Sequence, residues 1–226
     1  NGENLIAVEV HQSSRTSSDL SFDLELSGVQ FTTPNPLYLK TVGSNLLRAR
    51  VKNNNEWSAL TEAGFVVDAE PVSADNISVS EIHYRPSAPS VEEIEAGYNE
   101  RSDFEFIELL NVSSRAVDFG SVQFTKGIQF DFSLLNSART LLPGERGIIV
   151  NNYSAFNMRY GTKIDPGLKI LGEFVGNLNN DGEQLVVSDQ EGNSIIDITF
   201  NDGKEWPEGA DGLGYSLIKI NPVQNV

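Results

Sequence analysis

Residues 169–200 read KILGEFVGNLNNDGEQLVVSDQEGNSIIDITF and contain three runs rich in aliphatic and β-branched residues. These runs cover 169–175, 184–188 and 194–200, and Gly, Asn and Asp residues separate them. Short runs of this composition, bounded by turn residues, are typical of β-strands. The stretch therefore predicts three consecutive strands.

The same pattern extends toward both ends of the chain. Similar runs occur at 77–84, 104–110, 122–132, 147–150 and 215–220. Many short strands with turn residues at such spacing indicate a β-sandwich. We therefore predict an all-β, immunoglobulin-like sandwich.

Two short helices also fit the sequence. Ser90 and Glu93 form a capping box ahead of an apolar residue, and Gly97 would end that helix. Ser154 can cap a second helix over 155–160, with Gly161 as its C-terminal stop. Neither helix is long enough to organise the fold.

The composition agrees with a β protein. The 226 residues include 19 Gly and 9 Pro, with 39% hydrophobic and 21% charged residues, which excludes a disordered or fibrous chain. This length is enough for one large domain or two ordinary ones, and either would fold without metals or disulfides.

Charge and cysteine content exclude several functions. The chain has no cysteine, so thiol nucleophiles, disulfides and cysteine-ligated metals are ruled out. A net charge of −16 without a basic run predicts no binding to nucleic acid or to anionic membranes. No apolar stretch approaches the roughly 20 residues of a membrane-spanning helix. Because Asn1 is not a natural start, we expect a piece of a longer protein whose signal peptide lies elsewhere.

The first seventy residues predict a small β domain. Its strand-like runs cover 5–10, 20–26, 37–41, 44–52 and 64–67. Around 68–76 the sequence becomes polar, contains Pro71 and loses its apolar periodicity, as in a linker. We therefore predict a small β domain over 1–70, a linker over 71–76 and a sandwich over 77–226.

Seven segments of the larger region resemble, in family order, the lamin-tail domain of large exported bacterial proteins. They are Glu81–Pro86, Phe104–Asn111, Val122–Phe124, Leu142–Arg146, Leu178–Leu185, Trp206–Pro207 and Ala210–Leu217. The resemblance implies an immunoglobulin-like sandwich. It implies no common active site and no cofactor, because this family carries none that could be transferred residue by residue.

Two further resemblances lie before that region. Residues 5–26 are similar to the last two strands of a galactose-binding-type jelly roll, and residues 37–67 to part of a chitobiase C-terminal-type module. Such modules stand beside one another in extracellular multidomain proteins. The combination implies export or display at a bacterial cell surface and a noncatalytic accessory role.

Candidate catalytic residues are few. The only imidazoles, His11 and His83, lie in strand-like runs with no nucleophile-elbow motif nearby, so we read them as strand histidines. Glu105 and Glu108 could suggest a glycosidase pair, but their odd separation sends them to opposite faces of a strand. We expect one of them to face the core and to be paired with a buried donor.

One loop has the residue pattern of the first positions of a calcium-binding loop. Asn177, Asn179 and Asp181 alternate ahead of Gly182, but Ser188 stands where the closing glutamate would be. We favour a hairpin turn, with weak calcium binding as the alternative.

Two other places could contact a ligand. Trp57 could offer an aromatic platform to a sugar ring. The long acidic connection at 87–103 includes Glu92, Glu93 and Glu95, and long loops on rigid sandwiches often bind partners. The functional expectation is therefore an adhesion, scaffold or protein-interaction module that contacts a protein or glycan surface, with a carbohydrate-binding accessory module of a secreted hydrolase as the alternative and a hydrolase third.

Overall fold

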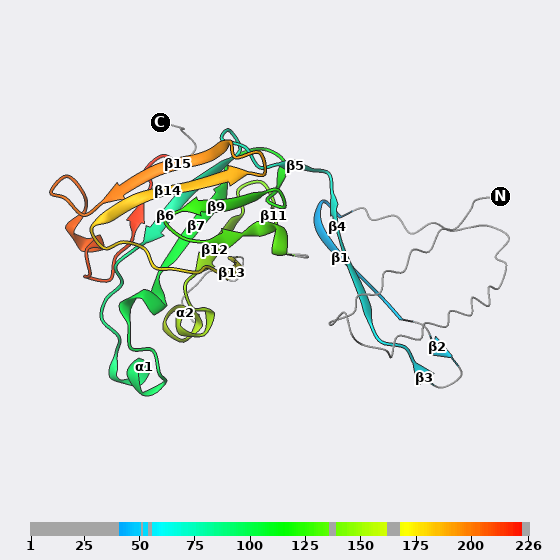
Figure 1. Cartoon of the computed structure of the whole chain (residues 1–226), viewed down its shortest axis with the longest axis horizontal. Helices are drawn as coiled ribbons and strands as arrows, with labels where there is room; N and C mark the ends of the chain where they lie inside the picture. The colour runs from blue at the N-terminus through cyan, green and yellow to red at the C-terminus, as the bar shows by residue number, and fades with distance from the viewer. Residues whose placement is uncertain (1–40, 51, 54–55, 136–138, 162–167, 223–226) are drawn as a thin grey trace. The chain divides into compact units, whose positions relative to one another are not determined.

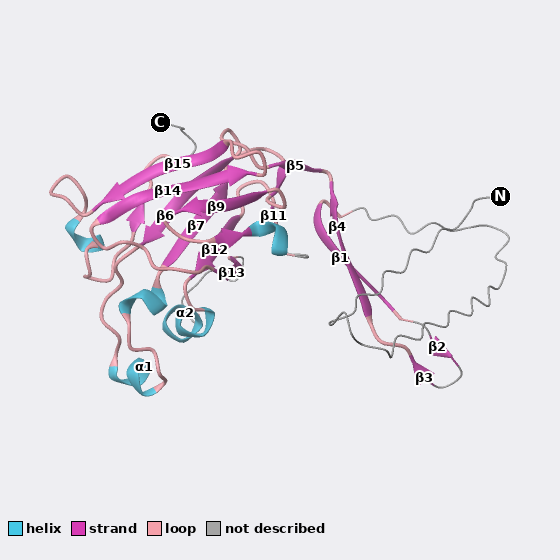
Figure 2. Ribbon diagram, viewed as in Figure 1, coloured by secondary structure: helices cyan, strands magenta, loops and turns pink. Residues whose placement is uncertain are grey.

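The computed structural model describes residues 41–50, 52–53, 56–135, 139–161 and 168–222. Strands dominate the described part of the chain, which contains two α-helices and three short 3-10 helices (Figure 2). The predicted all-β, sandwich-type fold is confirmed. The finer assignment to an immunoglobulin-like or lamin-tail type stays a prediction.

The larger sheet has five strands in the order β13-β12-β7-β6-β16. Its strands are β6 (Ile77–His83), β7 (Phe106–Asn111), β12 (Arg146–Val150), β13 (Lys169–Glu173) and β16 (Leu217–Ile218). All neighbours are antiparallel except β12 and β13, which are parallel. The predicted run at 104–110 begins later than expected, because Arg101–Phe104 form a 3-10 helix, η1.

A four-stranded sheet has the order β10-β9-β14-β15 and is antiparallel throughout. Its strands are β9 (Val122–Lys126), β10 (Phe130–Asp131), β14 (Gly182–Asp189) and β15 (Ser194–Asn201). A three-stranded sheet joins β11 (Thr140–Leu141), β8 (Ala116–Asp118) and β5 (Ala69–Pro71). The predicted run at 122–132 is thus divided into β9, β10 and the 3-10 helix η2 (Phe132–Leu134).

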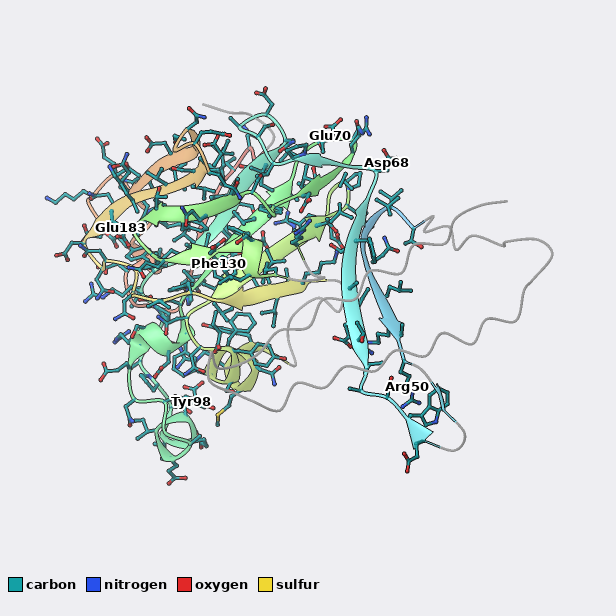
Figure 3. All side chains as sticks on the ribbon, turned by 45° about the vertical axis from the view of Figure 1, so that its right-hand side comes forward. Arg50, Asp68, Glu70, Tyr98, Phe130 and Glu183 are labelled. Carbon is teal, nitrogen blue, oxygen red and sulfur yellow. The ribbon has the colours of Figure 1, made fainter. Side chains whose placement is uncertain are left out.

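The main hydrophobic core lies between the five-stranded and four-stranded sheets (Figure 1). Ile107 and Leu109 of β7 contribute from one side, and Phe124, Leu185 and their neighbours contribute from the other. Phe130, labelled in Figure 3, packs edge-on against Phe132 with ring centroids 4.7 Å apart. The period-2 alternation of the strands supplies this core, as expected for a sandwich.

The other face of the five-stranded sheet is covered by helix α2 (Tyr153–Tyr160). Phe156 of α2 forms a second apolar cluster with Ile148 and Val150 of β12. The helix begins two residues earlier than predicted, because Asn152 rather than Ser154 is the N-cap and accepts from Ala155 N at 3.1 Å. The core covers one face of this sheet, and α2 covers part of the other face. Antiparallel sheets commonly leave one face exposed to solvent instead.

Strand β6 carries a β-bulge at Ser80. Val79 pairs with Leu109 and Glu81 pairs with Glu108, so residue 80 is extra in the register. An extra residue reverses the alternation of a strand. As a result Val79 faces the core before the bulge, and Ile82 faces it after the bulge.

Two hairpins precede the sandwich in the described part of the chain. Strand β1 (Gly43–Ala49) pairs with β4 (Thr61–Val67), and β2 (Lys52–Asn53) pairs with β3 (Glu56–Trp57). The strands expected at 5–10 and 20–26, the jelly-roll resemblance and His11 lie outside the described residues. A separate β domain over 1–70 therefore stays a prediction.

Residues 71–76 are folded against the sandwich. Val72 is part of the core, and its N–H donates to the Asp118 carbonyl at 3.0 Å. Asn76 is buried, accepts from Ser73 N at 2.7 Å and donates to the Pro71 carbonyl at 3.0 Å. The polar residues that suggested a linker thus hydrogen-bond within the turn that leads into β6, and the position of a domain boundary stays a prediction.

Candidate functional site

A cavity of about 260 Å³ lies on the α2 side of the five-stranded sheet. Its polar lining comes from Glu81, His83, Glu108 and Ser216. Its apolar and aromatic lining comes from Phe106, Ile148, Phe156 and Tyr160. Strands β6, β7 and β12, helix α2 and the segment before β16 therefore meet at one site.

The bulge at Ser80 places two carboxylates side by side in this cavity. Glu81 of β6 is the cross-strand partner of Glu108 of β7. Glu108 accepts from Ser80 Oγ at 2.6 Å and from Arg146 Nη1. Glu81 accepts from Ser216 Oγ and forms no ion pair with any described residue. Burial raises the pKa of Glu81, the Ser216 bond lowers it, and the charge of Glu108 raises it.

His83 is the next residue on the same face, and it is only 2% exposed. Burial lowers the pKa of His83 to about 4, so the imidazole is neutral at physiological pH. The ring hydrogen-bonds to the backbone of Tyr215, whose N–H already donates to the Gly209 carbonyl. The Tyr215 carbonyl is therefore the acceptor, and we assign the donor as Nε2 because Nδ1 has no partner among the described residues.

The second nitrogen of His83 has no partner among the described residues. Nδ1 is buried and lacks a hydrogen bond. In a neutral imidazole that donates through Nε2, Nδ1 carries a lone pair and can only accept. A buried acceptor without a donor is unfavourable, and such groups need an explanation.

Aromatic rings form one wall of the cavity. Phe106 lies 5.2 Å from His83, 5.6 Å from Phe156 and 6.0 Å from Tyr160 between ring centroids. Phe156 and Tyr160 are 5.0 Å apart. Burial raises the pKa of Tyr160, so its phenol keeps its proton at physiological pH. The cavity therefore combines acceptors on one side with aromatic surface on the other.

Glu105 and Glu108 are on opposite faces of the sheet, as the odd spacing predicts. Ile107 and Leu109 are in the core, so Glu105 is the residue that faces it, and both carboxylates are buried. Glu105 accepts from Leu178 N at 2.8 Å on the core side, whereas Glu108 is on the side covered by α2. The pKa of Glu105 is raised to about 8, mainly by burial. The hydrogen bond from Leu178 N–H lowers this pKa, and the charge of Glu183 raises it.

The three residues of the calcium-like loop lie in the exposed turn before β14. Asn179 Oδ1 accepts from Asp181 N at 3.0 Å, and Asn177 Oδ1 accepts from Asn151 Nδ2 at 3.0 Å. Glu183, labelled in Figure 3, accepts from Asn179 N at 2.8 Å. These oxygens stabilise the turn itself. Weak calcium binding by Asn177, Asn179 and Asp181 stays a prediction, and no cluster of three His, Asp or Glu suited to a metal occurs among the described residues.

Helix α1 (Val91–Glu95) lies in the acidic connection and has the predicted Ser90–Glu93 capping box. Glu92 and Glu95 are exposed, but Glu93 is buried and forms an ion pair with Arg159 of α2. Both oxygens of Glu93 accept hydrogen bonds from Arg159. A ligand contact through Glu92, Glu93 or Glu95 stays a prediction.

Trp57 is 51% exposed on β3. The guanidinium of Arg50, labelled in Figure 3, lies 4.2 Å from the centroid of its ring. One face of the indole is thus covered by a cation, which leaves less aromatic surface for a sugar than the sequence suggested.

Comparison with known proteins gives no assignment. No family model matches this chain, and no curated protein matches it. Among the described residues, no helix is long and apolar enough to span a membrane.

The cavity was not predictable from the sites named by the sequence alone. The sequence predicts an ordinary strand histidine at His83, and Glu81 and Ser216 lie in family-like segments that imply no functional role for them. One signal was present: apolar residues fall at 77, 79, 82 and 84, so the spacing of two is broken once. That break marks the bulge, and the bulge selects the residues that face the cavity.

Proposed function

We propose that this chain is a noncatalytic protein-interaction module, of adhesion or scaffold type, belonging to a larger exported bacterial protein with a lamin-tail-type sandwich. The observation that supports this proposal is the loop at 87–103, which is held rigidly yet presents apolar side chains to solvent. Exposed apolar groups on a braced loop are typical of contact surfaces.

Three interactions brace the loop. Glu93 and Arg159 join α1 to α2. Arg101 donates to the carbonyls of Pro86 at 2.6 Å and Gly212 at 3.2 Å. Tyr98, labelled in Figure 3, packs edge-on against Phe104 with centroids 6.3 Å apart. A loop held in this way loses little conformational entropy on binding.

The exposed surface of α1 indicates the chemistry that a partner would need. Val91 is 67% exposed and Ile94 is 49% exposed, and the exposed carboxylates of Glu92 and Glu95 flank them. A partner that covers this surface would need an apolar pocket with basic residues at its rim. We therefore propose a protein partner of that chemistry.

A random-peptide phage library tests the proposal. The library is panned on the full chain, and bound phage are compared on a Val91→Ser, Ile94→Ser double variant. We expect peptides that combine apolar and basic residues and lose binding to the double variant. Leu134→Ser, at a 75% exposed site elsewhere, is the matched control and should not change binding.

Two results would contradict the proposal. Peptides that bind the wild type and the double variant equally would exclude this surface. Turnover of glycosidic, ester or phosphodiester substrates by the purified chain would replace the noncatalytic role with hydrolysis. The carbohydrate-binding alternative rests on the exposure of Trp57, and glycan-array binding that Trp57→Ala abolishes would favour it.

A further inference from the structure

The cavity on the α2 side of the sheet is separate from the proposed protein-binding loop, and its chemistry is distinct. Its volume of about 260 Å³ is just below the roughly 300–1,000 Å³ of pockets for drug-sized ligands. It therefore suits a ligand of only a few heavy atoms, or a single side chain of another protein.

The polar groups of the cavity define which atoms the ligand must offer. Glu81 and Glu108 supply carboxylate oxygens, and His83 Nδ1 supplies a buried lone pair without a donor. Carboxylate oxygens and the lone pair of a neutral imidazole accept hydrogen bonds and do not donate them. A ligand that satisfies them must carry N–H or O–H donors.

Charge selects a cation over a neutral donor. Arg146 neutralises Glu108, and Arg159 is already paired with Glu93. Glu81 is partly buried, accepts from the Ser216 hydroxyl and forms no ion pair with a described residue, although the charge of Arg146 also acts on it. Two adjacent carboxylates that share one arginine carry a net negative charge, so a positively charged ligand gains more here than a neutral alcohol or sugar.

The aromatic rings that line the cavity also favour a positively charged ligand. Phe106, Phe156 and Tyr160 form adjoining rings beside the carboxylates, and aromatic rings attract ammonium and guanidinium groups. The aliphatic part of such a ligand would pack on Ile148 and Phe156.

We propose that this cavity binds a small organic cation, an amine or guanidinium group on a short aliphatic chain, held by Glu81, Glu108 and the Nδ1 lone pair of His83. The cation is either a free amine or the Lys or Arg side chain of another protein.

Histidine NMR tests the proposal directly, because the chain has only two histidines. The full chain, labelled with ¹⁵N-histidine, is titrated at pH 7 with n-butylamine and with n-butylguanidinium. We expect the Nδ1 signal of His83 to move by several parts per million as it accepts a hydrogen bond, while His11 stays unchanged. Equimolar n-butanol and glucose are the neutral controls.

Two conservative variants separate binding from folding. Glu81→Gln removes the charge and should weaken the affinity for n-butylamine at least tenfold. Glu183→Gln is the matched control, because burial also raises the pKa of Glu183 but this residue does not line the cavity. The affinity of the Glu183→Gln variant for n-butylamine should equal that of the wild type. The wild-type ligand series remains decisive even if Glu81→Gln does not fold.

The source of the cation is distinguished by N-acetyl-lysine amide and N-acetyl-arginine amide. Binding as tight as that of n-butylamine would indicate a partner's side chain, and exclusion of these larger probes would indicate a free amine. The proposal is overturned if no cation moves the His83 signal at 100-fold excess, or if n-butanol or glucose moves it equally. Neither result bears on the loop at 87–103, so the two proposals can fail independently.

Discussion

Arg159 of α2 donates two hydrogen bonds to Glu93 of α1, from Nε to Oε1 at 2.8 Å and from Nη2 to Oε2 at 2.6 Å. The guanidinium carbon also lies 3.2 Å from the centroid of the Phe104 ring. The two charged side chains are only 11% and 9% exposed. The pair therefore joins the loop at 87–103 to the sandwich through a contact that is largely shielded from solvent.

Arg159→Met should lower the free energy of unfolding by about 3 kcal/mol, because it leaves the Glu93 carboxylate buried without its cation. Arg48→Met is the matched control, since the Arg48–Glu62 pair is 63% and 44% exposed and should contribute less than about 1 kcal/mol. Urea denaturation followed by circular dichroism measures both. Equal losses in the two variants would show that the buried pair is not a structural joint.

Glu105 should make stability depend on pH. Its pKa is raised from 4.5 to about 8 in the folded chain, so between these values the folded state holds a proton that the unfolded state releases. The free energy of unfolding therefore falls as the pH rises through this window, with a slope from this group of up to about 1.4 kcal/mol per pH unit.

Glu105→Gln isolates this effect, because the amide keeps an oxygen for Leu178 N–H but does not ionise. The pKa of His83 is lowered to about 4, which gives the opposite slope below pH 6.5, so pH 6.5–8 is the clean window. We expect urea denaturation to show that the variant gains stability relative to the wild type across that window. A constant difference would show that Glu105 is ionised in the folded chain.

Gly182 cannot be replaced without strain. It has φ +93°, and an added Cβ would lie 2.5 Å from the Phe200 carbonyl oxygen and 2.6 Å from Asn201 Cα. Gly176 has a similar φ of +101°, but nothing lies within 4 Å of its Cβ position. Gly182→Ala should therefore destabilise the chain by about 2 kcal/mol more than Gly176→Ala, because only the former adds a backbone clash. Thermal unfolding compares them, and equal losses would contradict the clash.

Calcium should affect stability little. The oxygens of Asn177 and Asn179 already accept hydrogen bonds within the turn, and Asp181 is the one full charge of the three residues. A dissociation constant of about 10⁻³ M would give about 1.4 kcal/mol of stabilisation at ten times that concentration. Calorimetric titration that shows micromolar affinity, lost in Asp181→Asn, would make calcium-dependent adhesion the leading hypothesis.

Local rules predicted most of the strands but not the cavity. The strands at 184–188 and 194–200 are predicted from residue types that are neighbours in the sequence, and the structure confirms strands there. The lone pair of His83 depends on the Tyr215 carbonyl, which is distant in sequence and adjacent only after folding. Likewise, Glu93 looks like a surface charge until Arg159 is placed beside it. Residues whose role depends on a distant partner cannot be recognised from spacing alone.

The extra residue at Ser80 has a consequence for how this site can be gained or lost during evolution. Deleting Ser80 would restore a regular strand in which Glu81 and His83 still face the cavity and Ile82 still faces the core, and it would remove the hydroxyl that donates to Glu108. A single-codon gap at this position is thus compatible with the cavity. When relatives of this chain are sorted, such a gap does not by itself separate lineages with the cavity from those without it.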